Sequence, residues 1–239
     1  MSLGGKRAAA KPARRDEAER PFWISFSDLM TALMVLFLVA MTVALLAITD
    51  EIAETEDLKA AREEDIAQLM HSLKLASADF PGVSVRDRVV DFGDRARFDT
   101  NSHRLDEAQA QLLRTFVPKV LAAARDPLGE KWLKRIVVEG FADARGSYLH
   151  NLNLSLQRSE RVLCVLMAGP PAAAALSEAE RLQVRDLFLV SGASFNALKD
   201  SDAESRRIEL RLEFRELGEH RGASRQQSLD GDFRCPLDH

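Results

Sequence analysis

The chain has 239 residues, enough for one large domain or two small ones. Its 33 basic and 37 acidic side chains give a formal net charge of −4, which excludes a strongly basic nucleic-acid-binding protein. A hydrophobic content of 46% excludes a wholly disordered chain. The mean hydropathy of −0.17 is that of an ordinary soluble protein, but the apolar and charged residues are segregated along the chain.

The first predicted element is a membrane-spanning helix. Residues 29–48 carry no charge, and a helix of this length is about 30 Å long, the thickness of the hydrocarbon core of a bilayer. Basic residues precede this run and acidic residues follow it: Lys6, Arg7, Lys11, Arg14, Arg15 and Arg20, then Asp50, Glu51, Glu54, Glu56 and Asp57. This asymmetry predicts a cytoplasmic N-terminus. We therefore expect a cytoplasmic segment over 1–21, a single span over 22–48 and the remainder of the chain outside.

A cleaved signal peptide is the alternative for this apolar run. The apolar core of a signal peptide usually has about 7–15 residues and ends at a small-residue cleavage site. Here the run is longer and continues directly into Thr49, Asp50 and Glu51, so we expect an uncleaved anchor.

One acidic residue, Asp28, lies immediately before the uncharged run. It is either an interfacial carboxylate that reaches headgroup water or, since the preceding residues are also apolar, an acid inside the membrane. Inserting an ionised aspartate into the membrane costs about 2.5–3.5 kcal/mol of free energy, and burial favours the protonated form of its carboxyl group. One helix cannot shield such an acid, so partner helices are required. Channel-lining or helix-packing residues on this part of the helix are predicted to be Ser25, Thr31, Ala32 and Val35.

The segment that contains Asp28, PFWISFSDLMTALMVLFLV over 21–39, resembles the transmembrane segment of MotB-type stator subunits. Its lead-in Pro-Phe-Trp-Ile-Ser is most similar to that of the ZorB branch, from Zorya antiphage defence systems. The resemblance implies that Asp28 carries the translocated ion, with H⁺ favoured over Na⁺. It also implies a homodimer inside a ring of MotA-like subunits, named ZorA in the Zorya branch, and no cofactor.

Residues 49–82 are predicted to form a helical linker. Four apolar residues, Ile66, Leu69, Met70 and Leu73, recur at helical spacing, so the second half of this segment reads as an amphipathic helix that Asp79–Gly82 ends. Two roles stay open for it: a helical stalk, or a segment that forms a dimer or plugs the channel.

An α+β domain, one sheet with helices packed on one face, is predicted over 83–215. The strands are expected at Val83–Phe92, Ile136–Val138, Leu187–Ser191 and Arg206–Phe214, and the long helices at Leu105–Ala124 and Asn153–Met167. Ile208, Leu210, Leu212 and Phe214 alternate with charged residues and should face the core. In the second long helix, Leu152, Leu156 and Leu163 are expected on one side.

A polar motif follows the second predicted strand. Its members are Asp143, Gly146, Asn151, Leu154, Ser155 and Arg158, and their spacing resembles that of the OmpA-like peptidoglycan-binding domain, a βαβαβ-type fold. Arg206, Arg207, Ile208 and Glu209 match the closing strand of that domain, whereas Ala142 stands where the family commonly has threonine. The alternative is an ordinary loop with a weak surface ion pair.

The OmpA-like resemblance implies a role for each residue of this motif. Asp143 and Arg158 would bind the ammonium and carboxylate groups of diaminopimelate in the peptide stem, since one acid and one bidentate arginine suit the two ends of a zwitterion. Asn151 and Gly146 would shape the loop, and Leu154, Ser155 and Arg207 belong to the same predicted site.

No enzyme and no metal site are predicted. The five histidines show no paired-ligand spacing, and no Ser-His-Asp set is supported. Residues 216–239 are expected to form a flexible tail. In an oxidising compartment Cys164 and Cys235 would be able to form a disulfide that fastens this tail to the domain.

The function predicted from these elements is that of a peptidoglycan-anchored stator subunit of a proton-driven inner-membrane complex in antiphage defence. A flagellar MotB-type stator subunit is one alternative, although only about 35 residues separate the span from the first strand, fewer than flagellar stators usually have. A passive cell-wall anchor without ion transport and an energiser of the TolR/ExbD type are the others.

Overall fold

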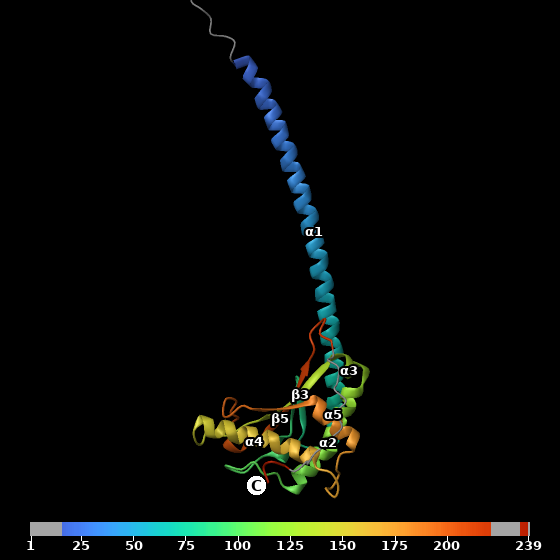
Figure 1. The fold of residues 1–239 in the computed structure, drawn as a ribbon, viewed down its shortest axis with the longest axis vertical. Helices are drawn as coiled ribbons and strands as arrows, with labels where there is room; N and C mark the ends of the chain where they lie inside the picture. The colour runs from blue at the N-terminus through green and yellow to red at the C-terminus, as the bar shows by residue number, and fades with distance from the viewer. Residues whose placement is uncertain (1–15, 221–234, 239) are drawn as a thin grey trace, which may run out of the picture. The chain divides into compact units, whose positions relative to one another are not determined.

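The computed structural model describes residues 16–220 and 235–238, and the chain divides into two compact units, Met1–Asp57 and Leu58–His239. Helix α1 (Asp16–Ser77) contributes residues to both units (Figure 1). Between Pro21 and Pro81 the sequence has neither proline nor glycine, which explains why the helix is uninterrupted there. Most of the predicted cytoplasmic segment, residues 1–15, lies outside the described residues.

The described part of the first unit consists of residues 16–57 of α1, which include its apolar run. An 18-residue window of this helix has a mean hydropathy of 2.7, and within the described residues it is the one helix that is long and apolar enough to cross a membrane. Its large apolar side chains are exposed, among them Leu33, Leu36, Phe37 and Leu46. A continuous exposed apolar surface of this length requires lipid or partner helices as its surroundings.

The second unit begins earlier in the sequence than the predicted domain boundary at residue 83. The apolar face of the predicted amphipathic helix, Ile66, Leu69, Met70 and Leu73, is buried in the main hydrophobic core. Residues 58–77 therefore belong to this unit rather than to a separate linker over 49–82. The physical reason is that an amphipathic helix is stabilised by packing its apolar face, and the domain supplies the matching surface.

Polar contacts also fix this part of α1 to the second unit. The Arg62 Nε donates to the carbonyl oxygen of Arg215 at 2.8 Å, and the Arg62 guanidinium lies over the Trp132 ring, 5.8 Å from its centroid. The Asp65 Oδ2 accepts hydrogen bonds from the Lys131 Nζ at 2.9 Å and the Trp132 Nε1 at 2.8 Å. One turn of α1 is thus joined to α3 (Pro127–Trp132) and to the residue after β5.

Acid should weaken this attachment through Asp65. The hydrogen bonds from Lys131 and then Trp132 hold the pKa of the Asp65 carboxyl below its ordinary value. A carboxyl with a lowered folded-state pKa stabilises the fold above its unfolded pKa of about 3.9, and this stabilisation is lost as the pH falls through the folded value. We expect the urea midpoint of the second unit to fall below about pH 4, with a smaller fall in Asp65→Asn. Equal falls in both proteins would contradict this role.

The sheet has five strands in the order β1-β2-β5-β3-β4. The strands are β1 (Ser84–Arg86), β2 (Val89–Asp91), β3 (Leu133–Gly140), β4 (Phe188–Gly192) and β5 (Ile208–Phe214). The β3–β4 pair is parallel and the other pairs are antiparallel. The single strand predicted over Val83–Phe92 is instead a hairpin, because the chain turns at Asp87, whose φ is 51°.

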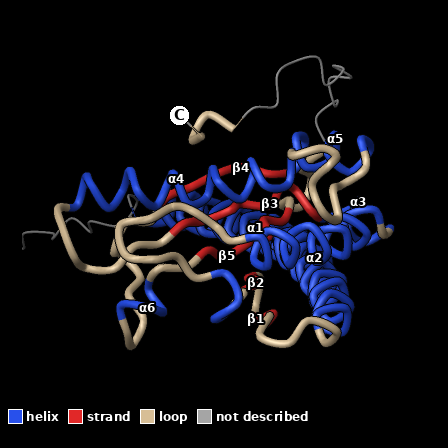
Figure 2. The backbone as a smooth tube through the Cα atoms, turned by 90° about the horizontal axis from the view of Figure 1, so that it is seen from below, coloured by secondary structure: helices blue, strands red, loops and turns tan. Residues whose placement is uncertain are grey.

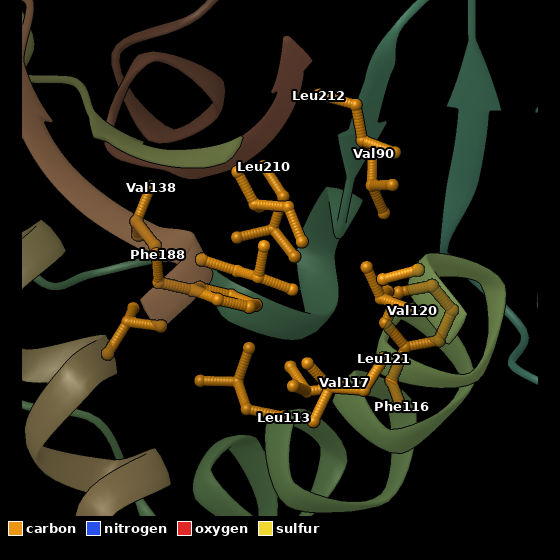
Figure 3. Packing of buried hydrophobic residues seen from close by; sticks show 14 of the residues in the cluster. Val90, Leu113, Phe116, Val117, Val120, Leu121, Val138, Phe188, Leu210 and Leu212 are labelled. Carbon is orange, nitrogen blue, oxygen red and sulfur yellow. The ribbon is translucent and has the colours of Figure 1, made fainter. Parts of the chain in front are cut away.

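Helices α2 (Glu107–Arg125), α4 (Tyr148–Met167) and α5 (Glu178–Leu187) lie near the sheet (Figure 2). Two short helices, η1 (Gly93–Ala96) and α6 (Asp202–Ser205), lie in the connections between these elements. The core lies between α2 and the sheet: Leu113, Phe116, Val117, Val120 and Leu121 face Val90, Val138, Phe188, Leu210 and Leu212 (Figure 3). The predicted inward face of β5 is confirmed, since Ile208, Leu210, Leu212 and Phe214 are all buried. The domain is thus of the predicted α+β class.

The buried side of α4 includes several polar residues. Leu156 is exposed, while the polar residues Asn151, Ser155 and Arg158 lie on the buried side. The reason is a close approach at glycine: a Cβ on Gly140 would lie 2.0 Å from the Ser155 carbonyl oxygen, and a Cβ on Gly192 would lie 2.6 Å from the Ser155 Oγ. The absence of side chains at the ends of β3 and β4 lets the polar face of α4 reach the sheet.

A disulfide joins Cys164 of α4 to Cys235, with a Cα–Cα distance of 5.2 Å. It attaches the segment 235–238 to the second unit. Residues 221–234 and 239 of the predicted tail over 216–239 lie outside the described residues.

Candidate functional site

The predicted ion-carrying residue, Asp28, lies on the exposed surface of α1. Thr31 lies one turn further along and donates from its Oγ1 to the Ser27 carbonyl oxygen at 2.8 Å, so its hydroxyl satisfies a hydrogen bond within the helix. Ala32 and Val35 are also exposed, and so is Ser25. Residues three and four apart share a helix face, so Asp28, Thr31, Ala32 and Val35 form one surface with a single acidic group and small or β-branched neighbours.

The second predicted site is built on the loop that joins β3 to α4. This loop is held to the rest of the sheet through its backbone: the Phe141 N–H donates to the Arg207 carbonyl oxygen at 3.0 Å, and the Ala142 N–H donates to the Ser194 carbonyl oxygen at 2.8 Å. The loop ends at Ser147, whose side chain caps α4 by accepting from the His150 N–H. A fixed loop of this kind can hold polar side chains in one geometry.

Asp143 is 5% exposed, and both of its carboxylate oxygens have partners. Its Oδ1 accepts from the Arg145 N–H at 3.1 Å, and its Oδ2 pairs with the Arg206 Nη1 at 2.9 Å. The Arg206 Nε in turn donates to the Phe98 carbonyl oxygen at 2.9 Å. The cation that pairs with Asp143 is therefore Arg206.

Arg158 is fully buried. It donates to three backbone carbonyl oxygens: its Nε to Ser102 at 2.9 Å, its Nη1 to Phe141 at 2.6 Å and its Nη2 to Asp99 at 3.1 Å. Burial lowers the pKa of Arg158 to about 10, while the Asp143 carboxylate opposes this shift, so the side chain stays charged at neutral pH. Arg158 thus joins the loop after β3 to the segment 99–102.

Gly146 and Asn151 act on the shape of the loop. Gly146 has a φ of +99°, a conformation that residues with a side chain rarely adopt. The Asn151 side chain is buried, and its Nδ2 donates to the Arg145 carbonyl oxygen at 2.8 Å. These contacts hold the turn that contains Asp143.

Three further predicted site residues have packing contacts. Leu154 and Ser155 are buried on α4, and the Ser155 Oγ accepts from the Ser194 N–H at 3.1 Å. Arg207 lies over the Phe141 ring, 3.9 Å from its centroid, and its Nε donates to the Glu209 Oε1 at 2.7 Å. The structure therefore brings Asp143, Gly146, Asn151 and Arg158 together at one loop, while Ser155 and Arg207 support that loop from either side.

Sequence reasoning missed the role of Arg206 in this site. Arg206 and Arg207 are adjacent just before β5, and their side chains point to different partners, Asp143 and Glu209. The sequence signal for this role was the pair of consecutive arginines before a predicted strand. Neighbouring side chains in an extended chain point to opposite sides, so the two arginines have different partners.

Comparison with known proteins identifies the family. The chain is 45% identical over 214 residues to Zorya protein ZorB from Escherichia coli O139:H28 (strain E24377A / ETEC), which covers 88% of this chain and 87% of that protein. The chain belongs to the ZorB family. Residues 5–47 of this ZorB-family chain also match a family model described as membrane MotB of the proton-channel complex MotA/MotB. The predicted resemblance to the ZorB branch of MotB-type subunits is therefore confirmed.

Solved structures that are similar to the chain include three of low sequence identity. The peptidoglycan-associated lipoprotein from Burkholderia pseudomallei is 16% identical, with a TM-score of 0.33, over 54% of this chain and 91% of that chain. The OmpA-like domain of FopA1 from Francisella tularensis subsp. tularensis SCHU S4 is 14% identical, with a TM-score of 0.35, over 56% of this chain and 82% of that chain. The periplasmic domain of MotB is 15% identical, with a TM-score of 0.37, over 57% of this chain and 69% of that chain.

Proposed function

We propose that this ZorB-family chain couples ion flow through a membrane complex to a cell-wall anchor. Family membership makes it a MotB-like stator subunit of a Zorya antiphage defence system. The proposal rests on the observation that one chain contains two separate candidate sites. One is the acidic residue Asp28 beside the exposed apolar part of α1, and the other is the Asp143 loop of the second unit. The family is one of structural subunits of a membrane complex rather than of enzymes.

Asp28 is the residue that carries the ion in this proposal, and the ion is H⁺. Partner helices from a MotA-like ring and from a second copy of the chain surround it, because α1 alone leaves its apolar face exposed. Protonation neutralises Asp28, and deprotonation restores its attraction to polar groups of the ring. Each proton that binds and leaves therefore switches the complex between two arrangements of packed helices. A membrane potential releases about 2.3 kcal/mol per elementary charge per 100 mV, which is enough to bias such an alternation.

The second unit binds the peptide stem of peptidoglycan in this proposal. Asp143 takes the ammonium group of diaminopimelate, and Arg158 takes its carboxylate. A guanidinium has five N–H donors. Backbone carbonyls of the described residues accept from three N–H groups of Arg158, so two N–H groups remain for a ligand. Because Arg158 is fully buried, the segment 99–102 has to shift when the ligand binds.

The proposed location is the bacterial inner membrane, with one span, a cytoplasmic N-terminus and a periplasmic second unit. The basic residues before the span support this orientation. The Cys164–Cys235 disulfide supports an oxidising compartment for the second unit. Attachment to the wall would hold this subunit still, so any rotation belongs to the ring.

Replacing Asp143 tests the wall-binding part. In Asp143→Asn the side chain keeps its size but loses its charge, so a charge-assisted contact worth about 1.5–3 kcal/mol is lost and binding to purified peptidoglycan should weaken about 10–100-fold. The measurement is co-sedimentation of the protein with peptidoglycan sacculi. Asp202→Asn is the matched control, because Asp202 pairs with Arg145 at an exposed position. Unchanged sedimentation of Asp143→Asn would contradict the proposed site.

A further inference from the structure

The C-terminal segment 235–238 lies against a basic pocket of the second unit. The cavity has a volume of about 400 Å³. It is lined by Arg104 and Leu105, which precede α2, by Arg161 of α4, and by Leu237 and Asp238 of the segment itself. The segment thus supplies part of the wall of the pocket and, among the described residues, its one acidic lining residue.

Arg161 is the residue that holds the segment. Its Nη1 pairs with the Asp238 Oδ1 at 2.6 Å, and its Nη2 donates to the Leu237 carbonyl oxygen at 3.3 Å. The Arg161 side chain is only 13% exposed, whereas that of Asp238 is 62% exposed. The Arg161 Nε is buried and has no hydrogen-bond partner in the part of the chain that the structure describes. A mostly buried guanidinium with an unused donor is a site that a carboxylate can satisfy.

The surroundings of the pocket are positive. His103, next to Arg104, has a pKa below its ordinary value, first because of burial and then because of the charges of Arg161, Arg104 and Arg158. The carboxylate of Asp238 acts in the opposite direction. Asp238 therefore supplies negative charge to a cluster of positive groups.

The disulfide keeps this carboxylate in place. Cys235 is bonded to Cys164, which lies one turn after Arg161 on α4. A solvent-exposed ion pair is weak on its own, but a tether raises the effective concentration of its partner and keeps the pair formed. The pocket and the proposed peptidoglycan site also share one loop, since the carbonyls of Asp99 and Ser102 bind Arg158 and Arg104 lines the pocket.

We propose that the pocket between Arg104 and Arg161 is a carboxylate-binding site, that Asp238 of the disulfide-tethered segment 235–238 binds Arg161 there as an internal ligand, and that a carboxylate of the peptidoglycan stem competes with Asp238 for Arg161. The last part rests on the peptidoglycan binding proposed above. Removing Asp238 or the tether opens the site to external carboxylates.

Chemical labelling of Arg161 tests occupancy in the full-length protein. Phenylglyoxal modifies accessible arginines, and mass spectrometry follows the peptide that contains Arg161. Two variants open the pocket differently: Asp238→Asn keeps the disulfide, and the double variant Cys164→Ser, Cys235→Ser removes it. We expect several-fold faster labelling of Arg161 in both, with unchanged labelling of Arg135 on the sheet as the internal control. Unchanged labelling of Arg161 in both variants would overturn the proposal.

The ligand class is tested with two probes on the double serine variant. Succinate, a simple dicarboxylate, should slow the labelling of Arg161 again, and absence of this protection would overturn the carboxylate site. A soluble muropeptide that carries diaminopimelate should protect more strongly than succinate. Protection by succinate without protection by the muropeptide would retain the carboxylate site and overturn its assignment to peptidoglycan. Failure of the proposed function is seen separately, as failure of the unmodified chain to sediment with sacculi.

Discussion

Cells that express Asp28→Asn together with the rest of the defence system should be as sensitive to phage as cells that lack the system. Asparagine is nearly isosteric with aspartate but does not take up and release a proton at physiological pH, so the complex would assemble and carry no ions. Because Asp28 lies on the exposed face of α1, the substitution leaves the fold of the second unit untouched. Plaque counts on the two strains measure the effect.

The matched control for this experiment is Asp57→Asn, another acid of the same helix that lies beyond the uncharged run. It should protect as well as the unmodified chain. Membrane levels of each variant and co-purification with the ring subunit show whether assembly is intact. Full protection by an assembled Asp28→Asn complex would instead favour the passive wall anchor, for which Asp28 is dispensable.

The largest effect on stability is expected at Arg158. Replacing Arg158 with methionine keeps most of the side-chain volume but leaves the carbonyls of Ser102, Phe141 and Asp99 without their donor. The buried Phe141 carbonyl, left unsatisfied, costs about 1–3 kcal/mol, and each of the two part-buried hydrogen bonds contributes about 1 kcal/mol, so the free energy of unfolding of the second unit should fall by about 3–5 kcal/mol. Urea unfolding followed by circular dichroism measures this loss.

Arg135→Met is the control for Arg158→Met. Arg135 is half-exposed on the outer surface of the sheet, where it pairs with Glu213. Exposed ion pairs contribute about 0–1 kcal/mol, so the control should lose no more than that. An Arg158→Met protein as stable as the control would show that Arg158 does not organise the loops, and the proposed site would lose its structural basis.

The elements with the strongest periodicity could be predicted from the sequence. The uncharged run of α1 predicts one continuous apolar helix, and the alternation of Ile208, Leu210 and Leu212 predicts one buried face of β5; the structure has both. The hairpin at Asp87 was missed because a positive φ at an aspartate has no pattern in the hydrophobic residues. The buried face of α4 was missed because it carries Asn151, Ser155 and Arg158, which periodicity alone assigns to solvent.

The candidate site was predictable as a set of residues but not as a set of contacts. The spacing of Asp143, Asn151 and Arg158 indicates that they share a loop and a helix, and the structure places them there. The pairing of Asp143 with Arg206 depends on how β5 lies beside β3, which local sequence does not specify. The same limit applies to residues 58–77: their amphipathic face is visible in the sequence, but the surface that covers it is formed by distant elements.

Proton uptake by membrane vesicles tests the central claim most directly. Vesicles that contain this chain and its ring subunit would be given an imposed membrane potential, and a pH-sensitive dye inside them would report proton entry. We expect proton entry with Asp28 and none above the protein-free background with Asp28→Asn. Equal proton entry in the two preparations would contradict it.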